Sequence, residues 1–455
     1  MCGIVGIFGV PSAAVHVANA LRSLQHRGQE AAGIVSSDGR ELHRHRSPGL
    51  VSDVFKKIDF EHDLPGNMAI GHLRYATSGD PGNVSSNRSI QPLMDDSILE
   101  QLAVVHNGNL ENAHDLRMML EMNGSIFNSR SDTEAFLHLT KRSKKPTLPE
   151  RLIECFGQVE GAYSILAMTP KTMYAAVDPY SFRPLCSAPF RGGIMFASET
   201  CAFDYFDIPP EQVTFLEPGV LLEVFNSGLK ARRHSFGSAK HCRNCMFEWV
   251  YFSRPDSRIW GQSVSVIREK FGRALARRHP AQADMVIPAP DSANNQALAY
   301  SKESGLPFGL GFMRFHYIGR TFIDPDQSSR GPNVRMKLSP DSAVVAGKRI
   351  VVVDDSIVRG NTTGKLVGLL RKAGATEVHV RIASPAVVHP CYWGIDTPKK
   401  ADLIASENSP ERIAELVGAD SLGYLEVSDM LEALGDPEGK RHCITCFNCQ
   451  HPTKS

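Results

Sequence analysis

Hydrophobic and polar residues alternate in short runs along the first half of the chain, and glycine-rich turns separate the runs. Alternation with a period of two is typical of β-strands with one buried face. The predicted strands are 3–9, 67–75, 102–108, 162–168, 173–178, 193–198 and 219–225. Two stretches, 13–27 and 131–143, repeat apolar residues every three to four positions and predict helices. The pattern predicts a layered α+β domain with large antiparallel sheets.

The pattern changes in the second half to helix, apolar strand and a loop rich in Gly, Pro and Asp. Helical periodicity and apolar runs alternate at 267–279, 283–291, 294–305, 348–356, 364–375 and 378–384. This alternation is typical of an α/β domain with a mostly parallel, doubly wound sheet. The polar, basic segment 229–245 is predicted to connect the halves. The sequence therefore predicts two domains, 2–235 and 260–455.

Composition and charge exclude several classes of protein. The 455 residues include 50 Lys and Arg against 49 Asp and Glu, a net charge of +1. Such balance leaves no basic surface for nucleic acid or an anionic membrane. No apolar run approaches the roughly 18 residues of a membrane span. The apolar start lacks a basic segment and contains Pro11, so it does not predict a secretion signal, and we expect a cytoplasmic protein.

Cys2 is the first candidate for chemistry. It follows the initiator Met directly, so removal of Met1 would leave a thiol and a free α-amine on one residue. Their ordinary pKa values, about 8.5 and 8, are close enough for the amine to act as the base of the thiol. The alternative from Cys2 alone is an inert, buried cysteine in an N-terminal strand.

Polar clusters at the ends of the predicted strands favour the chemical interpretation. Asn107 and Gly108 could offer an amide and a backbone N–H to an oxyanion. Arg74 could hold a carboxylate, and Asp132 could hold an ammonium group. Together these are the groups that glutamine requires, although Asn-Gly is also common in hairpins and Ser-Asp-Thr-Glu at helix starts. The clusters occupy 24–33, 71–79, 104–112 and 129–136.

In their order and spacing, MCGIVGIFG, LQHRGQEAAGI, GHLRYATSG, VVHNGNLEN and SDTE resemble the class II glutamine amidotransferase domain of N-terminal-nucleophile hydrolases. The resemblance implies a four-layer αββα sandwich. It implies Cys2 as nucleophile with its α-amine as base, and Asn107 and Gly108 as the oxyanion hole. Arg74 would bind the carboxylate of glutamine and Asp132 its amino group.

A second group of motifs lies in RIVVVDDSIVRGNTTGKLV, residues 349–367. An apolar strand stops at Asp354 and Asp355, and a loop with hydroxyls and glycine leads into a predicted helix. Ligands bind at this end of the strands in open α/β sheets. The loop suits a phosphate, and the two acids suit ribose hydroxyls or Mg²⁺. The alternative is a structural strand, turn and helix with capping acids.

This stretch resembles the phosphoribosyl-diphosphate signature of type I phosphoribosyltransferases. The flanking motifs FEWVYFSRPDS, VIPAPDS, YIGRTFIDPDQ and GADSLGYLEV narrow the resemblance to the amidophosphoribosyltransferases of purine synthesis. That family implies glutamine hydrolysis, an internal ammonia channel and attack on C1 of 5-phosphoribosyl 1-diphosphate. It implies Mg²⁺ at Ser292, Asp354 and Asp355. The implied phosphoribosyl-diphosphate contacts are Ser356, Arg359, Gly360, Asn361, Thr362 and Thr363, with Arg320, Arg330 and Lys337 on a closing loop, 317–337.

The chain departs from the family pattern at Ala293, Phe315, Gly331-Pro332 and Met336. These changes could alter pyrophosphate affinity or loop kinetics, and they leave open a relative with a weakened transferase step that hydrolyses glutamine or senses phosphoribosyl diphosphate. A glutaminase with another acceptor is disfavoured by the DDSIVRGNTT loop. The family further implies inhibition by purine nucleotides and a homo-oligomer, either tetramer or dimer.

Cysteines form the third group of motifs. The pair Cys443 and Cys446 has the CxxC spacing shared by zinc, iron–sulfur and redox sites, and Cys245 and Cys391 could complete a four-cysteine set. Their flanking motifs resemble the iron–sulfur branch of the family, which implies a 4Fe–4S cluster that pins the C-terminal tail. Zinc and uncoordinated thiols are the alternatives. Cys242 and Cys449 could replace Cys245 and Cys446 as ligands.

Overall fold

The computed structural model describes residues 2–75, 87–97, 100–225, 230–237, 242–314, 338–395, 397 and 399–451. The segment 317–337, with Arg320, Arg330 and Lys337, lies outside these residues, as does Phe315. Within the described ranges, no helix has both the length and the apolar character needed to cross a membrane.

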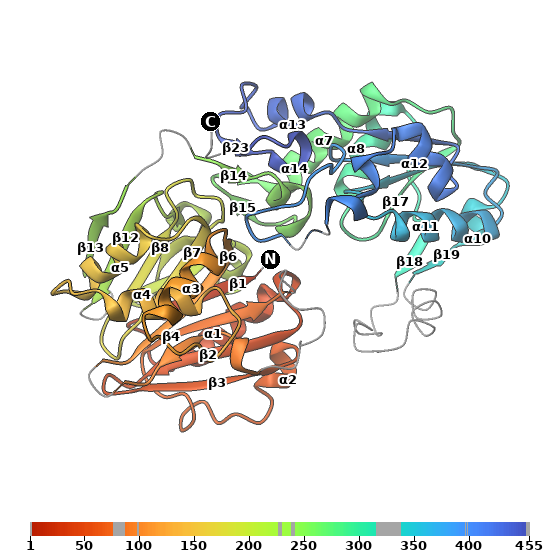
Figure 1. The fold of residues 1–455 in the computed structure, drawn as a ribbon. Coiled ribbons are helices and arrows are strands. Elements are labelled where there is room, and N and C mark those ends of the chain that lie inside the picture. Colours follow the sequence, from red (N-terminus) through yellow and green to blue (C-terminus); the bar gives the residue numbers. More distant parts are fainter. Residues whose placement is uncertain are drawn as a thin grey trace.

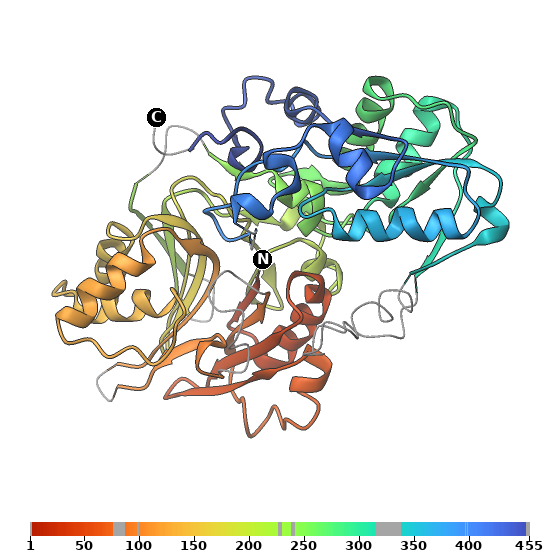
Figure 2. The ribbon, with the colours of Figure 1, turned by 45° about the vertical axis from the view of Figure 1, so that its right-hand side comes forward.

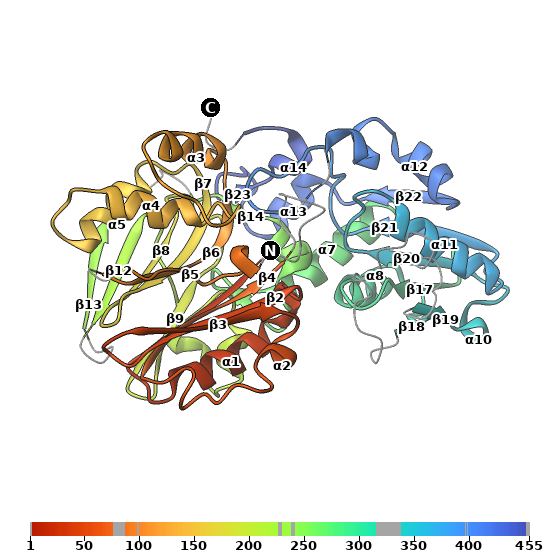
Figure 3. The same ribbon diagram turned by 60° about the horizontal axis from the view of Figure 1, so that its bottom comes forward.

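Two antiparallel sheets stack in the first half of the chain (Figure 3). The first contains β1 (Gly3–Phe8), β2 (Ala31–Ser37), β3 (Leu42–Pro48), β4 (Met68–Arg74), β9 (Cys186–Phe190), β10 (Gly193–Ala197) and β11 (Thr214–Phe215), in the order β11-β9-β10-β1-β4-β2-β3. The second contains β5 (Leu93–Asp95), β6 (Leu102–Leu110), β7 (Gly161–Met168), β8 (Met173–Val177), β12 (Val220–Phe225) and β13 (Lys230–Ser235), in the order β13-β12-β8-β7-β6-β5.

Helices cover the outer faces of both sheets. One core packs α1 (Ala13–Ser23), α2 (Val51–Val54) and α6 (Cys201–Asp204) on the first sheet. Another packs α3 (Ala113–Met122), α4 (Glu134–Arg142) and α5 (Leu148–Phe156) on the second. The inner faces share a third core, which includes Ile4, Val105 and Leu166. This is a four-layer αββα sandwich, and it confirms the predicted fold of this half.

A four-stranded parallel sheet forms the second half (Figure 1). Its strands are β17 (Met285–Pro288), β20 (Arg349–Asp354), β21 (Glu377–Ile382) and β22 (Ser421–Tyr424), in that order. Along β20, Val351 and Val353 join the core that contains α7 (Val264–Arg278) and α8 (Asn294–Ser304). Ile350 and Val352 join the opposite core, with α11 (Asn361–Lys372) and α12 (Pro410–Val417). Helices on both faces confirm the doubly wound α/β prediction.

The polar segment 229–245 is more than a connection, and that part of the prediction was wrong. Lys230–Ser235 forms β13, which pairs with β12 in the register Val220 opposite Ser235. Most of its side chains are exposed. An edge strand with both faces exposed to solvent lacks the alternation of apolar and polar residues by which strands are identified in a sequence, and this explains the error. Asn244–Cys245 also forms a short strand, β14, parallel to β23 (His442–Cys443).

Other short elements of the described chain include β15 (Arg258–Ile259), β16 (Gln262–Ser263), β18 (Phe312–Arg314), β19 (Leu338–Pro340), α10 (Ser342–Val345), α13 (Val427–Ala433) and α14 (Thr445–Asn448). The β14–β23 pairing ties the C-terminal tail to the segment between the halves. The start of β1 lies where the two halves face each other (Figures 1 and 2). The candidate nucleophile therefore lies near the second half.

Candidate active sites and cysteine cluster

A cavity of about 850 Å³ lies beside Cys2, directly before β1. The residue lines this cavity and is only 6% exposed. β1 is hydrogen-bonded on both sides, to β10 and to β4, which fixes the backbone that leads into Cys2. Further residues lining the cavity include His72, Arg74, Gln91, His106, Gly108, Asn109, Ser131 and Asp132.

Asn107 and Gly108 lie next to each other near the end of β6. The Asn107 side chain is fully buried, and neither its amide nitrogen nor its amide oxygen has a hydrogen-bond partner among the described residues. Gly108 has a φ of +154°, and a Cβ there would lie 1.9 Å from the carbonyl oxygen of Ala162. Glycine is thus required at this position. Asn107 is not among the residues that line the cavity, but its amide is a buried donor that the described protein does not use.

Two groups of opposite charge line the same cavity. Arg74 ends β4, and its Nε lies 3.8 Å from a carboxylate oxygen of Glu30. Asp132 accepts the backbone N–H of Leu110 at 3.0 Å and lies 3.8 Å from Nδ1 of His106. Burial acts to raise the pKa of Asp132, but His106 and the backbone N–H outweigh it, so the pKa is lowered and the carboxylate stays ionised.

The paired acids end β20 as the sequence predicts. Asp354 accepts the backbone N–H of Asp355 at 2.9 Å, and Asp355 accepts the hydroxyl of Ser356 at 2.6 Å. Burial and the proximity of the two carboxyl groups raise the pKa of Asp354 well above its usual range. Burial also raises the pKa of Asp355, although a hydrogen bond from Ser292 acts to lower it. Neighbouring buried acids of this kind are stabilised by a bound cation.

The loop after these acids leads into α11. Gly360 precedes the helix with a φ of +78°, and a Cβ there would lie 2.6 Å from Cδ1 of Ile404. Arg359, Asn361 and Thr362 are exposed, and Thr363 is buried. The departure Ala293 is buried directly before α8.

Comparisons with known proteins agree across the chain. The model of the glutamine amidotransferase domain family matches residues 74–205. The amidophosphoribosyltransferase of Bacillus subtilis (strain 168) is 43% identical, over all of this chain and 94% of that protein. That of Methanocaldococcus jannaschii is 41% identical, over 100% and 98%.

The chain belongs to the amidophosphoribosyltransferase family. A solved structure, the glutamine phosphoribosylpyrophosphate amidotransferase from B. subtilis complexed with ADP and GMP, has a TM-score of 0.91 and 42% identity. The match covers 100% of this chain and 98% of the solved chain. The resemblances of both halves are thereby confirmed as one family.

In this family member, the structure adds residues that the sequence reasoning missed. Arg27, fully buried after α1, donates from Nε to the carbonyl oxygen of Cys2 at 3.0 Å. His72 is buried on β4 opposite Ile4, and neither ring nitrogen has a hydrogen-bond partner in the described part of the chain. Burial, followed by the charge of Arg74, lowers the pKa of His72 to about 3, so its ring is neutral. The motif GHLRY contained His72, but nothing in the sequence indicated its burial.

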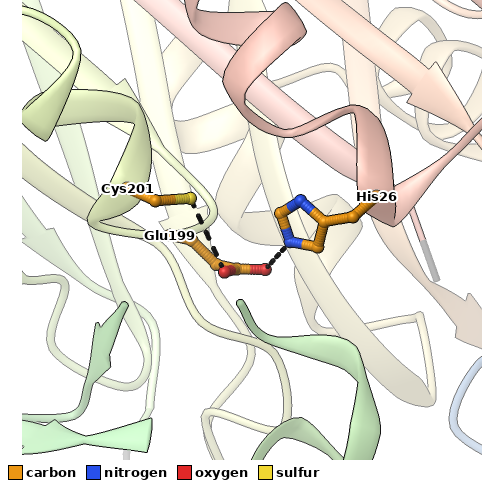
Figure 4. A group of neighbouring side chains, drawn as sticks. All are labelled: His26, Glu199 and Cys201. Carbon is orange, nitrogen blue, oxygen red and sulfur yellow. Dashed lines mark hydrogen bonds and ion pairs between the residues drawn. The ribbon is translucent and has the colours of Figure 1, made fainter. Parts of the chain in front are cut away.

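His26, Glu199 and Cys201 form a close group (Figure 4), and Arg27 links Glu199 of this group to the carbonyl oxygen of Cys2. Their ligand atoms lie within 4.8 Å of one another, as in a metal site. The carboxylate of Glu199 is already occupied, since it pairs with the Arg27 guanidinium and accepts the backbone N–H of Arg254 at 2.9 Å. A guanidinium in contact with the carboxylate repels a second cation, so the group is better described as a buried ion cluster.

Four cysteines of this family member surround an apolar cavity between the halves. Cys245, Cys391, Cys443 and Cys446 line it, with Phe182, Phe247, Trp393 and Ile395. Cys242 is half-buried and Cys449 exposed, and neither lines the cavity. Four cysteine thiols around one cavity fit both a zinc ion and an iron–sulfur cluster.

Proposed function

We propose that the chain converts glutamine, water and 5-phosphoribosyl 1-diphosphate into 5-phosphoribosylamine, glutamate and pyrophosphate, the first committed step of purine synthesis. We assign glutamine hydrolysis to residues 2–235 and phosphoribosyl transfer to residues 260–455. The observation that carries the proposal is the single cavity lined by Cys2, Arg74, Gly108 and Asp132, next to the unpaired buried amide of Asn107. Full-length family membership supports the second half of the reaction.

In the glutamine site, each group has a distinct role. The α-amine takes the proton of the Cys2 thiol as the sulfur attacks the side-chain amide carbon of glutamine. It later gives this proton to the amide nitrogen, which leaves as ammonia when its bond to carbon breaks and the thioester forms. Asn107 and the N–H of Gly108 stabilise the oxyanion. Arg74 holds the carboxylate of glutamine, and the ionised Asp132 holds its ammonium group. Water then releases glutamate from the thioester.

In the phosphoribosyl site, the Ser356–Thr363 loop holds the 5-phosphate at the start of α11, where backbone N–H groups point outward. Asp354, Asp355 and Ser292 would hold a Mg²⁺ ion, which supplies positive charge to the pyrophosphate leaving group. Ammonia reaches C1 of the ribose through an internal channel and displaces pyrophosphate there. Arg320, Arg330 and Lys337 would close over the phosphates.

We assign a 4Fe–4S cluster to Cys245, Cys391, Cys443 and Cys446, with zinc as the alternative. The four cysteines that line one cavity and its apolar lining support the cluster. The cluster would hold the C-terminal tail against the segment between the halves. We also propose inhibition by purine nucleotides, since the similar B. subtilis structure is a complex with ADP and GMP, and assembly into a homo-oligomer.

The test follows both products at once. Anaerobically purified protein receives glutamine, Mg²⁺ and phosphoribosyl diphosphate, and glutamate and pyrophosphate are measured together. We expect equal release of both. Cys2→Ala should lose glutamine-driven pyrophosphate release and keep the ammonia-driven reaction. Glutamate without pyrophosphate would contradict the proposal and indicate a different acceptor or a weakened transferase step.

A further inference from the structure

Four fully buried charged residues meet where the two halves join. They are two cations, Arg27 and Arg183, and two anions, Glu199 and Glu248, and each is at most 1% exposed. Arg27, Arg183 and Glu199 belong to the antiparallel half, whereas Glu248 comes from the segment between the halves. Buried charges persist only when they are paired, so these side chains fix one another's positions.

Arg27 is the centre of this cluster and contacts the nucleophile. Its guanidinium donates to both carboxylate oxygens of Glu248, at 3.0 Å from Nη1 and 2.9 Å from Nη2. Nη1 also donates to Glu199. This leaves Nε free to donate to the carbonyl oxygen of Cys2, at 3.0 Å. The two-point contact with Glu248 fixes the plane of the guanidinium and therefore the direction of Nε.

Glu248 is itself held by the second half of the chain. It begins a short π-helix, Glu248–Phe252, and accepts the hydroxyl of Ser253 at 2.9 Å. Arg268 on α7 donates to the carbonyl oxygens of Trp249 and Ser253, at 2.7 and 2.9 Å, so it holds both ends of the π-helix. α7 packs under the parallel sheet, where Phe271 shares a core with Val351 and Val353 of β20.

We propose that Glu248 is a positioning residue for the Cys2 nucleophile. It orients Arg27, and Arg27 holds the carbonyl of Cys2, so a residue anchored by the transferase half determines the geometry of the glutaminase reaction. The inference rests on the proposed role of Cys2. The thiol, the α-amine and this carbonyl belong to one residue, so a rotation of the backbone moves the nucleophile and its base together.

The first test is Glu248→Gln, which keeps the shape of the side chain but turns an NH₂ group toward the guanidinium. A displacement of about 1 Å at a nucleophile can lower the rate about 100-fold. We expect kcat for glutamine-driven turnover to fall about 10- to 100-fold. KM for glutamine should change less than about twofold, because Arg74 and Asp132 are untouched. The ammonia-driven reaction should equal that of the wild type.

Two further variants separate positioning from general damage. Asp178→Asn removes another fully buried carboxylate of the antiparallel half, one that accepts the backbone N–H groups of Tyr163 and Tyr180 and does not contact Arg27. It should keep the wild-type kcat for glutamine. Arg27→Lys keeps the positive charge but cannot make the two-point contact of the guanidinium with Glu248. Since that contact is already lost in Arg27→Lys, adding Glu248→Gln should lower kcat no further.

Three outcomes would overturn the inference: unchanged kcat in Glu248→Gln, additive losses in the double variant, or equal loss of the glutamine-driven and ammonia-driven reactions. The last would show that Glu248 only supports folding. Failure of the proposed function would be seen separately, because the wild-type protein would then release no pyrophosphate with either glutamine or ammonia.

Discussion

At the scale of single residues, Asn107 combines a structural cost with a proposed use. A buried amide without hydrogen bonds costs about 1–3 kcal/mol of stability. Such a group persists where the folded protein needs it for a ligand. Asn107 is fully buried, and its side-chain amide has no hydrogen-bond partner among the described residues. The next residue is Gly108, at a position where a Cβ would collide with the backbone. This pairing of cost and location supports its assignment to the oxyanion hole.

We expect Asn107→Ala to separate activity from stability. Loss of one oxyanion donor should lower kcat for glutamine about 100- to 1,000-fold. The free energy of unfolding should stay the same or rise, because the variant removes an unpaired buried group. Glutamine-driven kinetics and urea unfolding measure the two effects, and Asn123→Ala on an exposed position is the control. A large loss of stability with unchanged kcat would contradict the assignment.

At the scale of elements, the start of α11 depends on one glycine. Gly360→Ala places a Cβ at φ +78° and 2.6 Å from Ile404, so we expect a destabilisation of about 1–2 kcal/mol and a higher KM for phosphoribosyl diphosphate. Gly368 lies within the same helix with open space around it. Gly368→Ala should stabilise the protein by about 0.5–1 kcal/mol and leave that KM unchanged. Thermal unfolding and initial rates distinguish the two variants.

The start of α4 predicts a pH dependence of stability. Glu134 accepts the backbone N–H groups of Asn128 and Ser129, both at 2.7 Å. Burial opposes ionisation, but His138 and these donors outweigh it and lower the pKa of Glu134 from 4.5 to about 2. The stabilisation is therefore complete above pH about 4.5 and is lost as the pH falls toward about 2.

Glu134→Gln should therefore flatten the fall in stability between pH 4.5 and 2, measured as urea unfolding at several pH values. It should also be less stable than the wild type near pH 7. Glu211→Gln, at an exposed position, should keep the wild-type slope. A wild-type slope in Glu134→Gln would show that Glu134 does not have the lowered pKa.

At the scale of the whole molecule, the four-cysteine cavity joins segments far apart in the chain. Cys443→Ser should lower bound iron from about four atoms per chain and expose the C-terminal tail to protease. Cys449→Ser is the matched control, because Cys449 is exposed and does not line the cavity, and it should keep both iron and protection. Iron analysis, absorbance and limited proteolysis measure these effects. One zinc ion per chain in the wild type would instead support the alternative metal.

Much of this architecture was predictable because its signals are local. The buried strand β20 ends at Asp354 and carries a continuous apolar run, which identifies it without any partner. β13 was missed because its exposed polar side chains leave no alternation, and its place as a strand depends on pairing with β12. The candidate residues Arg74, Gly108 and Asp132 were identified by chemistry and resemblance, and their roles stay predictions.

The sequence by itself determined the two fold types and the order of the motifs, because apolar periodicity and short motifs are local features of a chain. For the residues that act on glutamine it gave predictions. Only the tertiary structure decided which distant charges share one buried site. Arg27 and Glu248 are 221 positions apart, and nothing near either residue indicates burial or a partner. A buried charge is tolerated only where folding brings its counter-charge to it, so this link from the second half to Cys2 exists only in three dimensions.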